Sequence, residues 1–168
     1  METGWPGRCF EDFDLGAVYD HRAGRTVTTT DNLWFTLLTM NTHPVHLDHA
    51  YAARTEFGRP LVNSTFTLAL VTGISVADLS QNAVANLGWD DVRLTAPVFE
   101  GDTLYARSEV LELRPSRSHP EAGIVRVRTV GYNQTGETVI TFERAMLVYR
   151  RDHLPSGKPL PPPLPGQE

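Results

Sequence analysis

The strongest hydrophobic pattern in the chain begins after Asn63 and Ser64. Between Phe66 and Leu79 apolar residues cover most of the circumference of a helix, which predicts a buried helix rather than a surface one. Asn63 or Ser64 is the expected N-cap, because either side chain can accept a hydrogen bond from a free N–H group of the first turn. The small residues that would allow a sheet to approach this helix closely are Thr67, Thr72, Gly73 and Ser75.

After residue 90 the pattern is typical of strands. Turn-forming residues at 100–102 and 135–136, and a loop with two prolines at 114–123, separate the apolar runs. In the third run Val125 and Val127 alternate with arginines, as expected when one face of a sheet is in contact with water. The predicted strands are residues 92–99, 103–113, 124–132 and 138–150.

The first half of the chain has a mixed pattern. β-Branched residues and a turn-forming Ala-Gly pair within residues 18–28 predict an early strand pair or hairpin. Thr30 or Asp31 is the expected cap of a short helix that runs to Leu38, and residues 48–55 predict another short helix. One buried helix followed by a series of antiparallel strands predicts an α+β fold, in which a long curved sheet wraps around the helix.

Residues 1–154 are expected to form one domain, because a chain of 168 residues leaves room for one domain with a tail. The remaining segment, residues 155–168, holds six prolines. Proline donates no backbone hydrogen bond, so this composition predicts a polyproline-like or disordered tail. We expect such a tail to be dispensable for folding.

Composition narrows the range of partners and locations. The net charge is −5 and the chain has a single lysine, which argues against nucleic-acid binding. No apolar stretch approaches the roughly 20 residues of a membrane span, and the first residues lack the features of a signal peptide. Cys9 is the only cysteine, so no internal disulfide can form, and a reducing, cytoplasmic location is expected.

The densest group of reactive side chains contains three of the six histidines. His43, His46 and His49 are spaced by three residues, which would bring them together on a helix and suggest a metal site. Pro44 disfavours helical backbone at His43, and no metal-binding motif accompanies the histidines, so no metal is expected. Histidine exchanges protons near neutral pH, which suits acid–base catalysis. From the residues alone, a polar loop in which His46 pairs with Asp48 or caps a helix remains equally open.

Residues 41–46 resemble the signature of the MaoC-like dehydratases, the (R)-specific enoyl-CoA hydratases. That signature runs Gly-Asp-x-Asn-Pro-aliphatic-His, and its proline, aliphatic residue and histidine are matched here. Residues 57–64 resemble the Arg-Pro-aliphatic-Val-His/Gln-Gly segment of the same family, which leads into its central helix. Residues 99–104 resemble its Val-x-x-Gly-Asp-Thr-Leu turn. The three matches occur in order and cover roughly residues 10–151.

Residues 34–41 and 55–64 are also similar to the mesaconyl-CoA (2-methylfumaryl-CoA) hydratases within that family. The resemblance implies a hot-dog fold and a homodimer or higher oligomer. It also implies reversible hydration of a short branched or dicarboxylic enoyl thioester, carried on CoA or on a carrier protein. The chemistry needs no cofactor, and no glycine-rich nucleotide motif is present.

Three positions depart from the family pattern. Asn41 stands where the family has the aspartate that shares water activation with the histidine, and His43 stands at the family's asparagine. Ser64 replaces the glycine whose backbone N–H helps to hold the thioester oxygen. Asparagine cannot accept a proton, so we interpret His46 as catalytic, His43 as a source of the missing basicity and Asn41 as a residue that orients water.

The same resemblance assigns substrate-binding roles. Asn63 and Ser64 lie at the expected helix start, where free N–H groups suit a developing enolate. Arg54 or Arg59 lies close enough in sequence to bind an acyl carboxylate, and pairing with Glu56 or with the 3′-phosphate of CoA is the equally open alternative. Two alternatives remain: a thioesterase, for which Glu56 is the nearest carboxylate, and a noncatalytic acyl-thioester binding protein.

Overall fold

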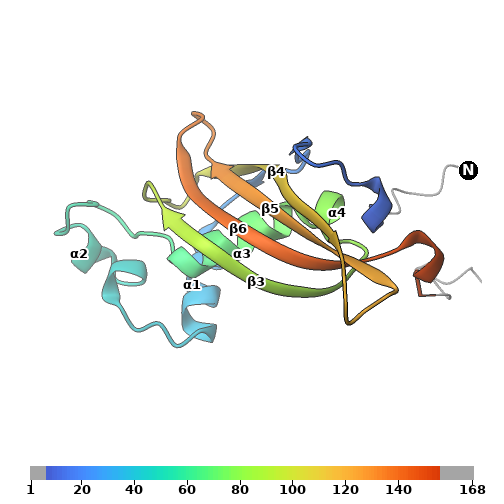
Figure 1. The fold of residues 1–168 in the computed structure, drawn as a ribbon. Coiled ribbons are helices and arrows are strands. Elements are labelled where there is room, and N and C mark those ends of the chain that lie inside the picture. Colours follow the sequence, from blue (N-terminus) through green and yellow to red (C-terminus); the bar gives the residue numbers. More distant parts are fainter. Residues whose placement is uncertain (1–6, 156–168) are drawn as a thin grey trace, which may run out of the picture.

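The computed structural model describes residues 7–155 and consists of an antiparallel sheet wrapped around one helix (Figure 1). Helix α3 (Ser64–Ile74) lies along the concave side of the sheet. The strand order is β1-β4-β5-β6-β3, and β2 also pairs with β4. This confirms the α+β architecture. The strands are β1 (Val18–Asp20), β2 (Arg25–Thr26), β3 (Ala83–Leu94), β4 (Thr103–Pro115), β5 (Ala122–Tyr132) and β6 (Thr138–Tyr149).

Short helices occupy both ends of the sheet. Helices α1 (Thr29–Leu38) and α2 (His49–Ala52) lie together at one end, and α4 (Val76–Leu79) lies at the other (Figure 1). Three single-turn 3-10 helices complete the described secondary structure: Phe10–Asp12, Pro44–His46 and Arg151–His153. The part of the chain that the structure describes contains no helix long and apolar enough to span a membrane.

The core lies between α3 and the central strands. Val71 and Ile74 of α3 pack with Leu104, Ile140 and Phe142. Burying each such side chain stabilises the fold by about 1.5–3 kcal/mol. The opposite side of α3 is exposed in the single chain, for example at Ala69 and Gly73. In the single chain, only the side of α3 that faces the sheet is buried. The prediction of a helix buried on all sides is therefore wrong for the single chain.

Gly131 of β5 explains how closely the helix approaches the sheet. A Cβ atom at this position would lie 2.7 Å from both Val71 Cγ2 and Ile140 Cγ2. Real Cβ atoms do not approach other carbon atoms so closely, so any larger residue would push α3 away from the sheet.

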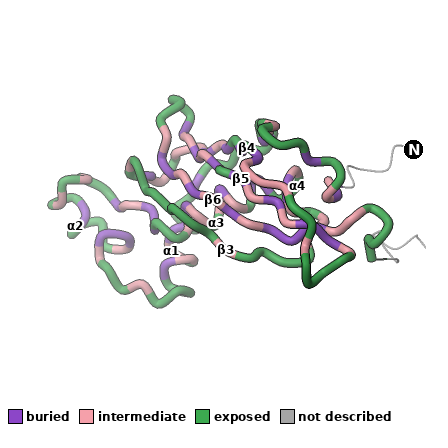
Figure 2. Tube along the Cα trace, in the orientation of Figure 1, coloured by how far each residue is buried: buried purple, intermediate pink, exposed green. Residues whose placement is uncertain are grey.

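The central strands match the sequence predictions and the edge strand does not. Strands β4, β5 and β6 agree with the predicted runs to within two residues at each end. Strand β3 begins at Ala83 and ends at Leu94, whereas the prediction placed a strand at residues 92–99. The reason is that β3 is an edge strand whose residues are almost all exposed (Figure 2), so its sequence lacks the alternation of a half-buried strand.

The predicted early strands are present as β1 and β2, but the prediction that they form a hairpin is wrong. Strands β1 and β2 do not pair with each other; each pairs with a different part of β4. Both therefore cover one edge of β4 in succession, with His21 at the end of the first strand donating its backbone N–H to Ala106 O over 3.1 Å.

The predicted helix starts and ends need two corrections. Helix α1 is capped by Thr28 rather than by Thr30 or Asp31: Thr28 Oγ1 accepts from Asp31 N at 3.2 Å, and Asp31 Oδ2 accepts from Thr28 N at 2.9 Å. This reciprocal pair moves the helix start upstream. Helix α3 ends at Ile74, and α4 is separate from it, because Ser75 Oγ donates to Thr72 O over 2.7 Å and closes the last turn.

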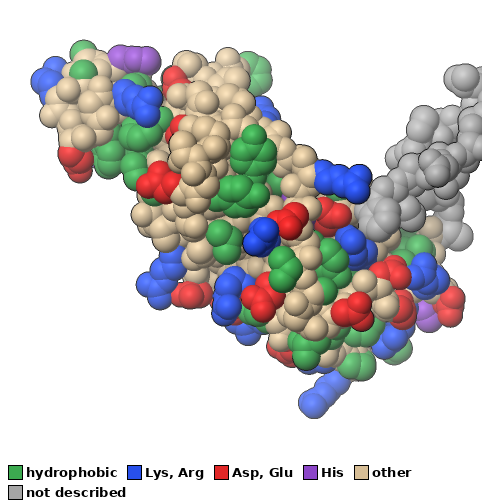
Figure 3. Space-filling model, turned by 90° about the horizontal axis from the view of Figure 1, so that it is seen from above, with side chains coloured by type: hydrophobic (Ala, Val, Ile, Leu, Met, Phe, Trp, Pro, Cys, Tyr) green, Lys and Arg blue, Asp and Glu red, His purple; other side chains and the backbone are tan. Residues whose placement is uncertain are grey.

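The surface mixes charges of both signs. On the face seen in Figure 3, acidic and basic side chains alternate with apolar ones and do not gather by sign over the sheet. The proline-rich tail predicted at residues 155–168 lies outside the described residues from position 156 onward, so both its disorder and its dispensability remain predictions.

Candidate active site

The C-terminal end of α1 places Asn41 at the start of the histidine loop. Met40 N donates to Leu37 O at 3.1 Å and Asn41 N donates to Thr36 O at 3.0 Å, which is the double hydrogen bond of a Schellman motif. Met40 occupies the left-handed position of this motif with φ of 55°. The backbone of Asn41 is therefore fixed by the end of the helix rather than by its own side chain.

The loop after Asn41 is held by its own side chains. Asn41 Oδ1 accepts from His43 N at 3.0 Å and closes a local turn. His43 caps the following 3-10 helix, where its Nδ1 accepts from Val45 N at 3.1 Å. Because Nδ1 accepts a hydrogen bond, it carries no proton, and neutral His43 holds its proton on Nε2.

His46 has the opposite arrangement of protons. Its Nδ1 lies 2.7 Å from Leu61 O, and a carbonyl oxygen can only accept, so Nδ1 is the donor. Neutral His46 therefore presents an unprotonated Nε2, the form that a general base requires. The residue is only 8% exposed, and the ring centroids of His43 and His46 are 6.0 Å apart. His46 is thus a buried imidazole with one fixed tautomer.

The start of α3 provides free backbone donors beside this loop. Asn63, which is 2% exposed, is the N-cap, and its Oδ1 accepts from Thr65 N at 3.0 Å. Thr67 N donates to Asn63 O. The N–H groups of Ser64 and Phe66 form no hydrogen bond with any residue between positions 7 and 155. Such free N–H groups at a helix N-terminus suit a negatively charged oxygen.

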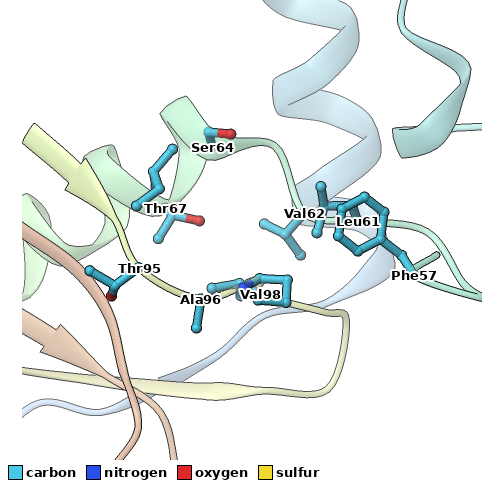
Figure 4. Close-up of a pocket in the computed structure, with 10 residues that line it drawn as sticks. Phe57, Leu61, Val62, Ser64, Thr67, Thr95, Ala96 and Val98 are labelled. Atoms are coloured by element: carbon cyan, nitrogen blue, oxygen red, sulfur yellow. The ribbon is translucent and has the colours of Figure 1, made fainter. Parts of the chain in front are cut away.

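A cavity of about 240 Å³ opens between the start of α3 and the segment that follows β3 (Figure 4). Ser64 and Thr67 line it from the helix, and Thr95 lines it from the opposite wall. His46 does not line this cavity, but Leu61, the residue whose carbonyl holds its ring, does. The cavity is lined by uncharged residues: Phe57, Leu61, Val62, Ser64, Thr67, Leu94, Thr95, Ala96, Pro97 and Val98.

The two candidate arginines lie outside the cavity. The Cζ atom of Arg59 lies 3.9 Å from the centroid of the Phe99 ring, and Phe99 in turn packs against Phe57 of the cavity wall at 6.5 Å between ring centroids. Arg54 is exposed. Neither arginine forms an ion pair with Glu56 or with any other acid in the described part of the chain. Both arginines are exposed, but only Arg59 is linked to the cavity wall, through Phe99 and Phe57.

The remaining polar residues of the loop have structural roles. Asp48 caps α2, its Oδ1 accepting from Tyr51 N at 2.9 Å. The interpretation in which His46 pairs with Asp48 is therefore wrong, since His46 bonds to Leu61 O instead.

Within residues 7–155 no three histidine, cysteine or acidic side chains are grouped closely enough to hold a metal ion.

Sequence reasoning missed Asn32 of α1, which is completely buried. Its side chain contacts the backbone of the histidine loop and of the α3 start. The available signal was weak: Asn32 and Thr36 are polar residues one helical turn apart in an otherwise apolar segment, and both are 0% exposed. Thr36 Oγ1 accepts from Asn63 Nδ2 at 3.2 Å.

Comparison with known proteins identifies the family to which the chain belongs. A family model for mesaconyl-CoA hydratase matches residues 1–157. The mesaconyl-CoA hydratase of Cereibacter sphaeroides is 39% identical over an alignment of 167 residues that covers 95% of this chain and 47% of that protein. A structure from Chloroflexus aurantiacus described as a MaoC domain protein dehydratase matches with a TM-score of 0.84 at 35% identity, covering 98% of this chain and 47% of that chain.

A further structural match comes from a Mycobacterium tuberculosis protein with a double hot-dog fold, with a TM-score of 0.80 and 26% identity over 92% of this chain and 47% of that one. The sheet around α3 and the histidine loop at its start thus define a hot-dog protein of the MaoC-like class. Within this class the chain belongs to the mesaconyl-CoA hydratase family. It spans about half the length of the curated relatives it matches.

Proposed function

We propose that this chain catalyses the reversible syn addition of water to a short, branched or dicarboxylic enoyl thioester of the mesaconyl-CoA type. The observation that carries the proposal is the buried His46, whose Nδ1–H is bound to Leu61 O and whose Nε2 is left as a base. The family assignment supports the substrate class. The thioester is carried on CoA or on a carrier protein.

In the proposed reaction His46 is the only base. Its Nε2 takes a proton from water as the water oxygen bonds to C3 of the enoyl group, and the electron pair of the double bond moves toward the thioester to form an enolate. The protonated Nε2 then returns this proton to C2 on the same face. The proton and the hydroxyl group both come from one water, so the addition is syn and His46 ends in its starting form.

His43 is assigned a different role from the one the sequence suggested. Its Nδ1 is occupied by Val45 N–H, so its neutral ring has no free lone pair with which to act as a base. Its Nε2–H can donate a hydrogen bond to the attacking water, as neutral imidazoles do in other enzymes. Asn41 supports the position of His43, because Asn41 Oδ1 accepts a hydrogen bond from the backbone N–H of His43.

The developing enolate requires donors that are already in place. The free N–H groups of Ser64 and Phe66 at the α3 start provide them, and the helix dipole adds partial positive charge there. Asn63 supports this arrangement by capping the helix through Oδ1 and thereby directing Thr65 N–H away from the substrate. Arg59 is the candidate for binding the distal carboxylate or the phosphate of CoA.

A second hot-dog domain completes the proposed assembly, as a homodimer or higher homo-oligomer. Strand β3 is an edge strand with Leu87, Trp89 and Leu94 exposed at 44–53%. Trp34 and Met40 beside the histidine loop are 68% and 86% exposed. Exposed apolar edges favour pairing with another sheet. Light scattering should give at least twice the 18.7 kDa mass of the chain, and an active monomer would contradict this proposal.

The thioesterase alternative is less well supported. It needs a carboxylate near the thioester carbonyl, and Glu56 is exposed and is not part of the cavity wall. A noncatalytic binding protein would leave the absorbance of the enoyl thioester unchanged. The proposed hydration uses no cofactor, and the expected cytoplasmic location remains a prediction.

The test follows the absorbance of the conjugated enoyl thioester. Mesaconyl-CoA, crotonyl-CoA and a linear octenoyl-CoA are each incubated with the wild-type chain, with His46→Ala and with His119→Ala, an exposed histidine outside the site. We expect absorbance loss without thiol release, fastest for the short substrates, and a loss of about 10²–10⁴-fold in His46→Ala only. Release of free thiol, or a folded His46→Ala with full activity, would overturn the proposal.

A further inference from the structure

Asn32 connects three segments that build the site. Its Oδ1 accepts from Asn63 N at 3.0 Å, at the cap of α3. Its Nδ2 lies 3.3 Å from His46 O and 3.3 Å from Leu61 O. One side chain on α1 therefore contacts the backbone of the histidine, of the residue that holds the histidine ring and of the helix cap.

The carbonyl of Leu61 is shared between the two side chains. It accepts from His46 Nδ1 at 2.7 Å and from Asn32 Nδ2 at 3.3 Å. A carbonyl oxygen has two lone pairs, so both acceptor sites are used and the direction of the C=O group is fixed. Since this C=O group fixes the tautomer of His46, the orientation of the base depends on Asn32.

The amide of Asn32 is itself oriented from outside. Glu100 Oε1 lies 3.4 Å from Nδ2, and the other carboxylate oxygen accepts from Thr29 Oγ1 at 2.7 Å. Three acceptors around Nδ2 and one donor at Oδ1 leave only one way to place the amide nitrogen and oxygen. Asn32 itself is 0% exposed, so its amide is shielded from bulk water.

We infer that Asn32 is a positioning residue of the hydratase site. It keeps His46 Nε2 in the correct position relative to the free N–H groups at the start of α3. The inference rests on the proposed function for its effect on turnover, and on the hydrogen bonds alone for its effect on the histidine ring. Reaction geometry tolerates little displacement: an error of about 1 Å at a catalytic group costs on the order of 10²-fold in rate.

The test is Asn32→Asp, which keeps size and the acceptor for Asn63 N but replaces the donor with an oxygen that faces two carbonyls and Glu100. We expect kcat to fall by about 10²-fold with KM unchanged, because Asn32 does not line the cavity. In ¹⁵N spectra of labelled histidine, His46 should change from one fixed tautomer to a mixture of two.

Asn133→Asp is the matched control. Asn133 is also a buried asparagine, and its Nδ2 also donates to a glutamate, Glu137 Oε2, at 3.1 Å. All its side-chain hydrogen bonds stay within its own turn. This variant should be less stable than wild type and should leave both kcat and the His46 spectrum unchanged.

Two measurements separate the possible failures. If the wild-type chain hydrates no enoyl thioester, the proposed function fails, and the ring tautomer of His46 still decides the role of Asn32. If Asn32→Asp is folded with an unchanged His46 spectrum, or loses no more turnover than Asn133→Asp, the positioning role is overturned. A fixed tautomer in wild type that is lost in Asn32→Asp alone supports it.

Discussion

His21 Nε2 and Ser108 Oγ are hydrogen-bonded at 2.9 Å, and His21 Nδ1 lies 2.9 Å from Asp78 Oδ2. The order serine, histidine, aspartate is that of a hydrolytic triad. Here Ser108 is completely buried and its Oγ also bonds to Thr129 Oγ1 at 2.8 Å, so no substrate can reach it. The three side chains join the end of β1, the centre of β4 and helix α4, and their role is to stabilise that junction.

This junction predicts a pH dependence of stability. Burial lowers the pKa of His21, and the hydrogen bond and charge of Asp78 offset this only in part. The unfolded chain therefore binds a proton at this histidine before the folded chain does as the pH falls. The contribution of neutral His21 is fully present above about pH 6.5 and is lost as the pH falls below that value toward the lowered folded pKa.

Urea unfolding at about pH 7.5 and about pH 5.5 measures this effect. The free energy of unfolding of the wild-type chain should fall between the two conditions by more than that of His21→Leu. His119→Leu, at an exposed histidine paired with Glu121, should retain the wild-type difference. Equal pH dependence in all three proteins would contradict the assignment.

Replacing His43 by asparagine distinguishes the two possible roles of His43, a hydrogen-bond donor and a general base. Asparagine keeps a side-chain N–H donor but cannot take a proton, so the donor role predicts a loss of less than about tenfold in kcat. A base at this position would instead lose about 10²–10⁴-fold, as expected for His46→Ala. The absorbance assay with matched protein concentrations decides between the two results.

The acceptor function of Asn41 predicts different results for two substitutions. Asn41→Ala removes the hydrogen bond to His43 N, which is worth about 1 kcal/mol, and should lower kcat about fivefold. Asn41→Asp keeps the acceptor and adds a proton-accepting group, so its activity should equal or exceed that of wild type. An alanine variant with full activity would show that the turn is not needed for catalysis.

The parts of the fold that the sequence predicted are those in which burial leaves a pattern. Strands β4 and β6 place apolar residues in two core clusters, helix α3 contributes to the first and β5 to the second. Strand β3 was misplaced because neither of its faces is buried in the single chain, so Leu87 and Trp89 follow no alternation. Thr28 was missed as the cap because several neighbouring residues are equally good caps by type, and only the geometry selects one.

The candidate site is visible in the sequence only in part, for a similar reason. His46, Asn41 and His43 are close in sequence, so their motif was visible. Asn32 was not, because its partner Asn63 is 31 residues away and a lone asparagine in a helix carries no motif. The tautomers of the two histidines were also beyond sequence reasoning, since they depend on Val45 N and Leu61 O. The structure therefore changed the interpretation of His43 from base to donor.

The backbone of Met40 predicts a stabilising substitution. Its φ of 55° lies in the left-handed region, which costs a residue with a side chain about 1–2 kcal/mol. The side chain is 86% exposed, so its loss removes little packing in the single chain. Met40→Gly should raise the free energy of unfolding by about 1 kcal/mol. Thr39→Gly, at a φ of −92°, is the control and should be neutral or destabilising.

Arg59 provides the last prediction, which concerns the acyl group. The cavity is uncharged, so the distal carboxylate of a dicarboxylic substrate requires a cation outside the cavity walls. Arg59 meets this need better than Arg54, because its guanidinium stacks on Phe99, which packs against Phe57 of the cavity wall, and has no acidic partner in the described part of the chain. Charge-assisted hydrogen bonds of this kind are worth about 1.5–3 kcal/mol.

Arg59→Gln should therefore lower kcat/KM for mesaconyl-CoA by roughly 10- to 100-fold and leave that for crotonyl-CoA, which lacks the second carboxylate, nearly unchanged. Arg54→Gln is the control and should affect neither substrate selectively. An equal loss for both substrates in Arg59→Gln would assign this arginine to the CoA phosphates, because both substrates share that part. Unchanged values for both would remove Arg59 from the binding site altogether, since a cation that binds either group must alter at least one of the two ratios.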